Sequence, residues 1–552
     1  MKLNIVFYKE NWIQNYKKIS SKNDLVYFIG PCIFDDKKKV INDHNELNQI
    51  ALKERDNFCD WIASFNDLFI EKKLIYKDLS LFFLSDLSVK RNEVLDTFDV
   101  ICILKQIKNI YEKKQITKID IYNCDPKFEI ALKSFLQINN IKIINYYNKK
   151  KTRNIFFEFL STVNFFFKCF IVSFFNYRPI SKKKIKNVYL STYPSHFKNN
   201  KYFSEDKYKY LVKIQDTFLL SLLTDGFHQN LNIIEYFKNK KELKKIYRFK
   251  IIILESFFKF TDIFLSLFKS FNIFFKILVL KNKTYIFNKI NLSDYIKIEL
   301  NVSFSRISRN ILIIKTLNNF FTYNSVLNFY YYMHEYPIGR SVSYALKKNN
   351  VKNSFAFQHG PASNRKILYF LSKNETNLNL PDLKSVPMPK NVYAEESFSQ
   401  KIYNYSNYKN VIIMDTIPRL DYLKDIKPLK DNHFILVVPG LHDGKFLLDQ
   451  LKKNISNSDS KTRFIFKSHP KSNLNISNYI TSAKLIISKE HISKLLCRAS
   501  KVICTYSSVA IEAKILGLEV ELIDIPGKVN LSPLIDNEFL NALKELKKKI
   551  IY

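Results

Sequence analysis

The feature that most limits the fold of this chain is a repeated alternation of short apolar runs with longer charged stretches. Between residues 433 and 527, the runs HFILVVPG, RFIFKSHP, KLIIS, KVICTYSS and LEVELIDIPG are separated by spacers of helical length. Short β-branched and aromatic runs that alternate with helical stretches are typical of parallel α/β sheets. We therefore expect residues 416–536 to form a compact Rossmann-like domain.

The same alternation upstream predicts a larger α/β unit. Its expected strands lie at 100–104, 116–124, 141–147, 186–194, 231–237, 325–337, 353–360, 391–396 and 410–415. A chain of 552 residues exceeds what one core usually holds, so two or three domains are expected. We predict an α/β fold with two Rossmann-like domains facing a cleft. Residues 1–415 form the first domain, 416–536 the second and 537–552 a C-terminal helix, and residues 1–95 show no motif.

Two apolar segments, 155–176 and 251–280, predict helical insertions near 150–178 and 240–283 of the first domain. Their polar residues recur every three or four positions, which places them on one stripe of each helix. In the longer segment this stripe consists of Glu255, Lys259, Asp262, Ser266, Lys269, Asn272 and Lys276. A membrane-spanning helix is disfavoured, because each charge costs roughly 2.5–3.5 kcal/mol at mid-bilayer. Helices lying in the membrane interface and helices packed inside the protein remain as alternatives.

The charge of the chain favours an anionic partner. It has 88 Lys and Arg against 51 Asp and Glu, which gives a formal net charge of +37. Part of this positive charge follows from a composition rich in Lys, Asn, Ile, Phe and Tyr. The remainder fits an anionic membrane surface or an anionic substrate. The N-terminal MKLNIVFYKENW lacks the apolar core of a signal peptide. We expect a cytoplasmic protein, peripheral on the inner face of the cytoplasmic membrane.

The seven cysteines form no Cys-x-x-Cys pair and no Cys/His spacing suited to a metal. Scattered on apolar segments, they are expected to be reduced, buried thiols. The sequence therefore predicts no metal site.

The most informative segment, KVICTYSSVAIEAKILGLEVELID, covers residues 501–524. An apolar strand runs into Tyr506, Ser507 and Ser508, and a helix is expected to follow. Serines at such a turn expose N–H and hydroxyl groups near the positive end of the helix dipole, which suits a phosphate. Glu512 lies one turn later on the same face, where a carboxylate can accept hydrogen bonds from ribose hydroxyls. The alternative is an ordinary N-cap serine and a surface glutamate.

A second motif ends the strand RFIFKSHP with Lys467, His469 and Pro470. Ligands of open α/β sheets bind beyond the carboxyl ends of the strands. Lys467 and His469 can both donate to a phosphate, while Pro470 ends the strand. We expect this motif and the serine turn to lie at neighbouring strand ends, so that one nucleotide phosphate contacts both.

A third segment, HFILVVPGLHDGKFLLDQL, places Gly440 after a strand and Gly444 before a helix. Both glycines allow a ligand to approach the backbone closely. His442 or Asp443 would then reach the donor or the acceptor. The alternative is a simple βα loop.

Together, the His-Pro, Ser-Ser and Glu-Ala-x-x-x-Gly motifs resemble the donor domain of bacterial GT-B enzymes that use CMP-activated acidic sugars, the sialyl-, polysialyl- and Kdo-transferases. The Ser-Ser pattern also resembles the CDP-polyol phosphotransferases of teichoic-acid synthesis. Segments 188–211, 329–346, 355–360 and 417–423 are similar to a surface carbohydrate biosynthesis family. The chain has His442-Asp443-Gly444 where classical sialyltransferases have two acidic residues before the glycine.

The resemblance implies a glycosyltransferase that moves a sugar from a nucleotide-activated donor to a growing capsule, O-antigen or lipooligosaccharide. In the families it resembles, this sugar is acidic and CMP-linked. Gly440, Lys467, His469, Pro470, Tyr506, Ser507, Ser508 and Glu512 would hold the nucleotide. No cofactor is implied. The expected partners are the nucleotide-sugar donor, a glycan or lipid-linked glycan acceptor and an anionic inner-membrane surface, with no nucleic acid.

An inverting transfer needs a general base on the acceptor side. Glu335 and His359 lie at expected strand ends of the first domain and are the candidates, with Asp443 on the donor side. Glu335 has the alternative of a solvated loop carboxylate, and His359 that of a structural histidine. Arg340 and Arg365 are candidates for binding an anionic group, or are plain surface cations.

Other classes of function remain as alternatives. A CDP-polyol phosphotransferase would share the fold and differ in the group transferred. A nucleic-acid-binding protein would fit the charge of +37, but the chain has no zinc-finger, RNP-type or KH signature. A non-catalytic scaffold of the polysaccharide machinery would keep the fold without the chemistry.

Overall fold

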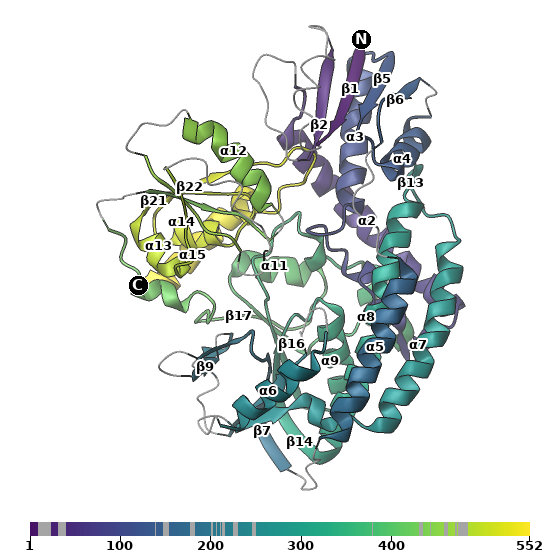
Figure 1. Ribbon diagram of the computed structural model, residues 1–552, viewed down its shortest axis with the longest axis vertical. Coiled ribbons are helices and arrows are strands. Elements are labelled where there is room, and N and C mark those ends of the chain that lie inside the picture. The colour runs from purple at the N-terminus through teal and green to yellow at the C-terminus, as the bar shows by residue number, and fades with distance from the viewer. Residues whose placement is uncertain are drawn as a thin grey trace.

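The computed structural model describes residues 1–8, 24–30, 40–137, 140–146, 154–176, 183–199, 203–205, 207–209, 211, 216–224, 230–245, 250–377, 379–429, 434–441, 443–456, 462–469, 472 and 484–551. Three parallel β-sheets, each packed against helices, make up this part of the chain (Figure 1). Figure 1 shows the first unit in purple and blue at the top, the third in yellow and green beside it, and the second below both.

The first sheet belongs to residues 1–146 and has the strand order β2-β1-β5-β6. Its strands are β1 (Lys2–Phe7), β2 (Leu25–Ile29), β5 (Lys118–Tyr122) and β6 (Ile141–Ile143). Its helices are α2 (His44–Glu71), α3 (Thr97–Lys113) and α4 (Pro126–Leu136). Residues 1–146, which we expected within a larger first domain, thus carry a sheet of their own.

The second sheet has seven strands in the order β11-β10-β7-β14-β15-β16-β17. They are β7 (Lys183–Thr192), β10 (Thr217–Leu222), β11 (Lys250–Ile253), β14 (Asn324–Tyr332), β15 (Asn353–Phe357), β16 (Asn391–Ala394) and β17 (Val411–Ile413). The helices of this unit are α5 (Ile155–Phe174), α6 (Ile233–Lys244), α7 (Phe260–Lys281), α8 (Ser293–Tyr323), α9 (Pro337–Lys348), α10 (Lys373–Thr376) and α11 (Ser397–Tyr405).

The third sheet has five strands in the order β20-β19-β18-β21-β22. They are β18 (Phe434–Val438), β19 (Phe464–Phe466), β20 (Leu485–Ile487), β21 (Ala499–Cys504) and β22 (Glu519–Leu522). Its helices are α12 (Gly444–Ser456), α13 (Ile492–Arg498), α14 (Val509–Ile515) and α15 (Asn537–Ile551). Three short antiparallel pairs complete the strands: β3 (Ile75–Tyr76) with β4 (Leu79–Ser80), β8 (Phe197–Asn199) with β9 (Phe203–Glu205), and β12 (Ile286–Phe287) with β13 (Ile290–Asn291).

All neighbouring strands within the three main sheets are parallel, as the alternating sequence pattern predicts. The predicted α/β class is therefore confirmed. The second and third sheets are the two Rossmann-like domains, and the expected helical insertions are present as α5 and α7.

Two segments expected as strands are helices. Residues 100–104 lie in α3, where every side chain from Thr97 to Leu104 is buried, so an all-apolar run does not distinguish a buried helix from a buried strand. Residues 231–237 open α6, whose N-cap Asn232 accepts hydrogen bonds from the backbone N–H groups of Ile234 and Glu235.

The apolar segment 251–280 is not one helix. It begins as β11 and a short 3₁₀ turn, and α7 starts only at Phe260. Glu255, expected on a polar helix stripe, is instead buried, and its Oε1 accepts the backbone N–H groups of Leu223 (2.8 Å) and Thr224 (2.9 Å). The carboxylate satisfies backbone donors at the end of β10, which have no strand partner there.

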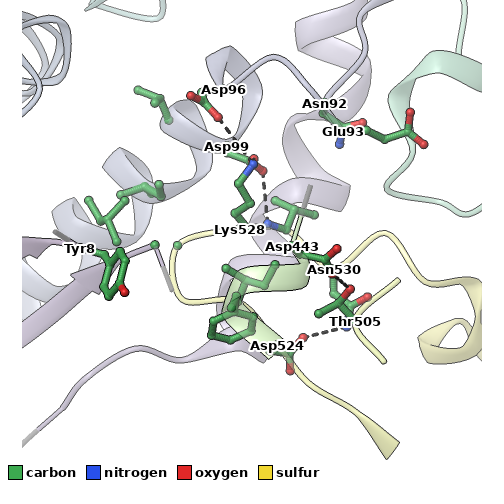
Figure 2. A pocket seen from close by; sticks show the side chains of 18 of the residues that line it. Tyr8, Asn92, Glu93, Asp96, Asp99, Asp443, Thr505, Asp524, Lys528 and Asn530 are labelled. Atoms are coloured by element: carbon green, nitrogen blue, oxygen red, sulfur yellow. Dashed lines mark hydrogen bonds and ion pairs between the residues drawn. The ribbon is translucent and has the colours of Figure 1, made fainter. Parts of the chain in front are cut away.

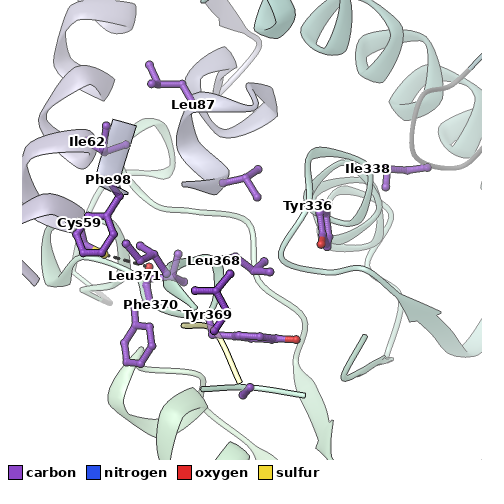
Figure 3. Packing of buried hydrophobic residues seen from close by; sticks show 14 of the residues in the cluster. Cys59, Ile62, Leu87, Phe98, Tyr336, Ile338, Leu368, Tyr369, Phe370 and Leu371 are labelled. Atoms are coloured by element: carbon purple, nitrogen blue, oxygen red, sulfur yellow. Dashed lines mark hydrogen bonds between the residues drawn. The ribbon is translucent and has the colours of Figure 1, made fainter. Parts of the chain in front are cut away.

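The first and second units share one continuous core (Figure 3). Phe98 of α3 and Cys59 of α2 pack near residues 368–371 of the second unit, and the Cys59 thiol donates to the carbonyl of Phe370. Five of the six described cysteines are buried, as expected, and Cys497 is partly exposed. The last helix, α15, returns from the third unit to α11, where Phe539 meets Phe398 edge to face.

Candidate functional site

The carboxyl ends of the second and third sheets face each other. Arg419, in the connection between them, shows this directly. Its guanidinium donates to both carboxylate oxygens of Glu395 beyond β16 (2.8 and 2.6 Å), and Nη1 lies 3.7 Å from Glu512 on α14. Residues that follow the strands of either sheet therefore border a common region, as ligand sites of open α/β sheets do.

His359 follows β15 directly and is half-buried at this carboxyl edge. Its ring Nδ1 is buried and has no hydrogen-bond partner within the described part of the chain. Burial lowers the pKa of His359 well below its usual value, and Lys207, Lys366, His196 and Arg91 lower it further. The imidazole is therefore neutral at pH 7, the form that can accept a proton.

We call Arg91, Lys207 and Lys366 the cationic cluster. They come from three places: the loop before α3, the segment after β9 and the loop after β15. Glu93 balances part of their charge, with Lys366 Nζ at 2.6 Å and Arg91 Nη2 at 3.6 Å. The pKa of Glu93 is raised by burial, but Lys366 and Arg91 outweigh this and lower it, so Glu93 is ionised. Excess positive charge next to an imidazole suits a phosphate or carboxylate.

Glu335, the other candidate base, follows β14 but points into the protein. It is 2% exposed and accepts a hydrogen bond from the Tyr403 hydroxyl at 2.7 Å. His334 beside it is also buried, and burial lowers its pKa. Glu335 thus does not share the half-exposed position of His359.

On the third sheet, Gly440, Asp443 and Tyr506 meet at the ends of β18 and β21. A Cβ at Gly440 would lie 3.0 Å from Asp443 Oδ1 and 3.0 Å from the Tyr506 ring. The Thr505 hydroxyl donates to Asp443. A larger residue than glycine at 440 would therefore displace this contact.

The His-Pro and Ser-Ser motifs lie at the same edge of the third sheet, but not on neighbouring strands. His469 and Lys467 follow β19, Ser507 and Ser508 follow β21, and β18 lies between them. All four side chains are half-buried. The expected adjacency was wrong because the strand order of a parallel sheet does not follow the chain order. Pro470 and His442 lie outside the described residues.

Glu512 is buried and already bonded. It accepts a hydrogen bond from the Tyr422 hydroxyl and lies in the ion pair with Arg419. Burial raises its pKa, which Arg419 and Tyr422 partly offset. In this structure Glu512 joins the third unit to the connection that leads to the second.

Arg340 and Arg365, expected to bind an anionic group, are committed to the protein itself. Arg340 is 2% exposed and donates to Ser88 Oγ at 2.6 Å and to the carbonyl of Phe83. Arg365 donates to the carbonyl of Asn530 and pairs with Asp536 at 3.0 Å. These contacts tie units together, so we leave both arginines out of the site.

The cationic cluster is the part of the site that the sequence did not indicate. Its members are separated by more than one hundred residues in places, and each is one of 88 basic residues in the chain. Among the described residues, no group of three or more His, Cys, Asp and Glu side chains is placed to hold a metal.

No family model and no curated protein sequence matches the chain. Among solved structures, the wall teichoic acid polymerase TagF is 12% identical, with 73% of this chain and 92% of that chain covered and a TM-score of 0.31. A UDP-N-acetylglucosamine 2-epimerase is 11% identical (66% and 90% covered, TM-score 0.33). MurG of Acinetobacter baumannii is 10% identical (66% and 94% covered, TM-score 0.30). At these identities and TM-scores, the similarities assign neither a family nor a function to this chain.

Proposed function

We propose that this protein is a glycosyltransferase that takes a sugar from a nucleotide-activated donor, with His359 as the general base. The observation that carries the proposal is a neutral imidazole with an unbonded nitrogen at the carboxyl edge of a parallel sheet, within the electrostatic influence of three cationic side chains. The donor nucleotide would lie against the facing edge of the third sheet, near His469, Ser507 and Ser508.

The chemistry follows from these positions. An acceptor hydroxyl gives its proton to His359 while its oxygen forms a bond to the anomeric carbon of the donor sugar. The bond between that carbon and the nucleotide phosphate breaks, and the phosphate leaves with the electron pair. The cationic cluster stabilises the negative charge that develops on the phosphate.

For the donor, we propose a CMP-linked acidic sugar and a bacterial surface polysaccharide as the product. The motifs at His469 and Ser507–Ser508 support the nucleotide, and the positive charge around His359 supports an anionic sugar. The same charge also favours a second candidate, transfer of a polyol phosphate from a CDP-polyol. In that reaction the acceptor oxygen bonds to phosphorus and CMP leaves.

A donor panel tests the proposal. Purified protein is incubated with CMP-, CDP-, UDP- and GDP-activated donors, and the products are identified by mass. Release of CMP with transfer of an acidic sugar is expected, whereas gain of a polyol phosphate would establish the second candidate. No turnover of any donor would refute both.

We further propose that the protein rests on an anionic membrane surface through α5 and α7. Both helices are long and apolar enough to cross a bilayer, and 39% of the apolar window of each is buried. Both pack on α8 (Figure 1), and their other faces expose phenylalanines. The most exposed are Phe157 (67%), Phe167 (63%), Phe174 (82%), Phe268 (62%) and Phe275 (63%).

Most of the polar stripe of α7 faces the protein, and Asn272 is exposed. Lys269 Nζ donates to the carbonyl of Ile75 at 2.7 Å, and Lys276 Nζ to that of Lys73 at 2.9 Å. An aromatic face turned outward, with the polar residues bonded inward, suits contact with acyl chains. Beside the end of α5, α6 exposes Lys238, Lys241, Lys244 and Lys245, which suit anionic headgroups.

Co-sedimentation with vesicles of phosphatidylglycerol and phosphatidylethanolamine tests this surface. The double variant Phe268→Ser, Phe275→Ser should lose most of the binding, because two apolar anchors are removed. Leu429→Ser, at an exposed leucine outside these helices, is the matched control. Equal binding by all three proteins would exclude this surface.

A further inference from the structure

A cavity of about 360 Å³ lies between the first and third units (Figure 2). It is bordered by the carboxyl ends of β1, β2 and β5 on one side and by those of β21 and β22 on the other. Its volume lies in the range of about 300–1,000 Å³ that small-molecule sites occupy. Two sheets thus direct their ligand-binding edges at one space.

The charge of the cavity wall is opposite to that of the chain. Six acidic residues line it against a single basic one, Lys528, although the chain has 88 basic and 51 acidic residues. Lys528 lies 3.5 Å from Asp96 and 3.8 Å from Asp99, as Figure 2 shows. Residues drawn at random from this composition would give the wall more basic than acidic side chains. The excess of carboxylates therefore needs a specific reason.

The neutral groups of the wall are amides and aromatic rings. Asn92, Asn123 and Asn530 supply amides, and the Asn530 side chain donates to Asp524 at 2.7 Å. Tyr8, from the end of β1, and Tyr506, from the end of β21, supply rings from opposite units. Carboxylates and amides bond hydroxyl groups, while rings cover the apolar faces of a sugar.

The wall disfavours the other ligand classes. A phosphate or an acidic sugar would meet a wall with six acidic side chains and a single lysine, whose excess of negative charge repels it. A metal ion is disfavoured too, because the described residues bring no three suitable ligands together. An uncharged polyol with hydroxyl donors fits both the charge and the rings.

The cavity adjoins the cationic cluster through Glu93. This residue lines the cavity and also bonds Lys366 and contacts Arg91. A molecule in the cavity would therefore lie next to the residue that pairs with two members of the cationic cluster.

We propose that this cavity binds an uncharged sugar of the acceptor glycan, held by Asp96, Asp524 and Asn530 and covered by Tyr8 and Tyr506. The inference rests on the proposed glycosyltransferase function and names its acceptor class. The two regions divide the substrates: the cationic cluster takes the anionic group and the cavity takes the neutral sugar.

Direct binding tests the proposal without any donor. The full-length protein is titrated with methyl glycosides of glucose, galactose, N-acetylglucosamine and N-acetylgalactosamine, followed by saturation-transfer NMR and calorimetry. At least one glycoside is expected to bind. Asp524→Asn should raise its Kd at least tenfold, because a charged acceptor is lost while the shape of the side chain is kept.

Val100→Phe, on the wall of the cavity, should abolish binding by filling the space. Asp67→Asn, at an exposed carboxylate paired with Lys384, is the matched control and should bind like the natural protein. Equal Kd values in all variants would place the sugar elsewhere and overturn the proposal. So would displacement of the glycoside by CMP or by free sialic acid, or binding of no glycoside.

Donor hydrolysis to water, measured with no acceptor present, reports on the proposed function alone. If hydrolysis occurs and no glycoside binds, the acceptor inference fails and the transferase function stands. If glycosides bind in the cavity and no donor is hydrolysed, the transferase function fails and the sugar site stands.

Discussion

The surroundings of His359 and the cavity between the first and third units are neighbours with opposite electrostatics. Near His359, three cationic side chains lower the pKa of the imidazole, which burial lowers most. In the cavity wall, six acidic residues face one lysine. Glu93 belongs to both. A chain with a net charge of +37 therefore does not present one uniform field, and adjacent regions can select an anionic group and a neutral one.

The largest expected effect is on catalysis at His359, and it distinguishes this region from the cavity. His359→Asn should lower the rate of transfer between about 100- and 10,000-fold, the usual contribution of a general base. Binding of glycosides in the cavity should not change. Rates are measured with the active donor, and His44→Asn, at the start of α2, serves as the control. A loss of less than tenfold would exclude His359 as the base.

A pair of variants should divide the substrates. Lys207→Gln removes one positive charge near His359 and is expected to raise the KM of the donor about tenfold, equivalent to about 1.4 kcal/mol. Asp524→Asn is expected to raise the KM of the acceptor by a similar factor. Each variant should leave the other KM within a factor of about two. If both variants change the same KM, the division of roles is wrong.

An acidic residue of the cavity wall should also affect how the free energy of unfolding depends on pH. Burial raises the pKa of Asp99 from its usual 3.8 to about 7, while Lys528 partly opposes the shift. The folded protein thus holds a proton that the unfolded chain releases, so its stability falls as pH rises from about 4 to 7. Asp99→Asn removes this loss. The free energy of unfolding of the variant, relative to that of the natural protein, should therefore increase by about 1–3 kcal/mol between pH 5 and pH 8. Urea unfolding at both pH values measures it, and a constant difference would contradict the assignment.

The smallest expected effect concerns the pH profile of transfer. Because the pKa of His359 is held well below 6.5, kcat/KM should stay level down to pH 6.5 and fall only in more acidic buffer. Removing the charge of Lys366 by Lys366→Met should move this acidic limb upward by less than about one pH unit. An unchanged limb would mean that another group titrates.

The strands were predictable where an apolar run is followed by residues that end a strand. The runs that became β18, β21 and β22 end at polar or glycine residues, and the helix between the last two closes at Gly517, which has a positive φ. Where these signals disagree, the prediction failed. The run at 100–104 has the composition of a strand, but it lies in α3 because a helix buried on all sides needs apolar residues at every position.

The candidate site was predictable only in part, for a related reason. The positions of His359, His469 and Ser507–Ser508 after strands were predictable, because a strand end is a local feature of sequence, and their roles stay predictions. Arg340 and Arg365 have the composition of anion-binding residues, yet both are bonded to distant carbonyls and hydroxyls. A charge in a sequence does not reveal its partner.

The sequence by itself determined that the chain folds into parallel α/β sheets and which polar residues stand at the strand ends. Only the tertiary structure decided which of those ends meet, that residues 1–146 form a separate sheet, and that Arg91, Lys207 and Lys366 act on the pKa of His359. The periodicity of apolar residues indicates which side of a helix or strand is buried. It does not identify the neighbour against which that side packs. Contacts between segments hundreds of residues apart arise from the joint packing of all three sheets.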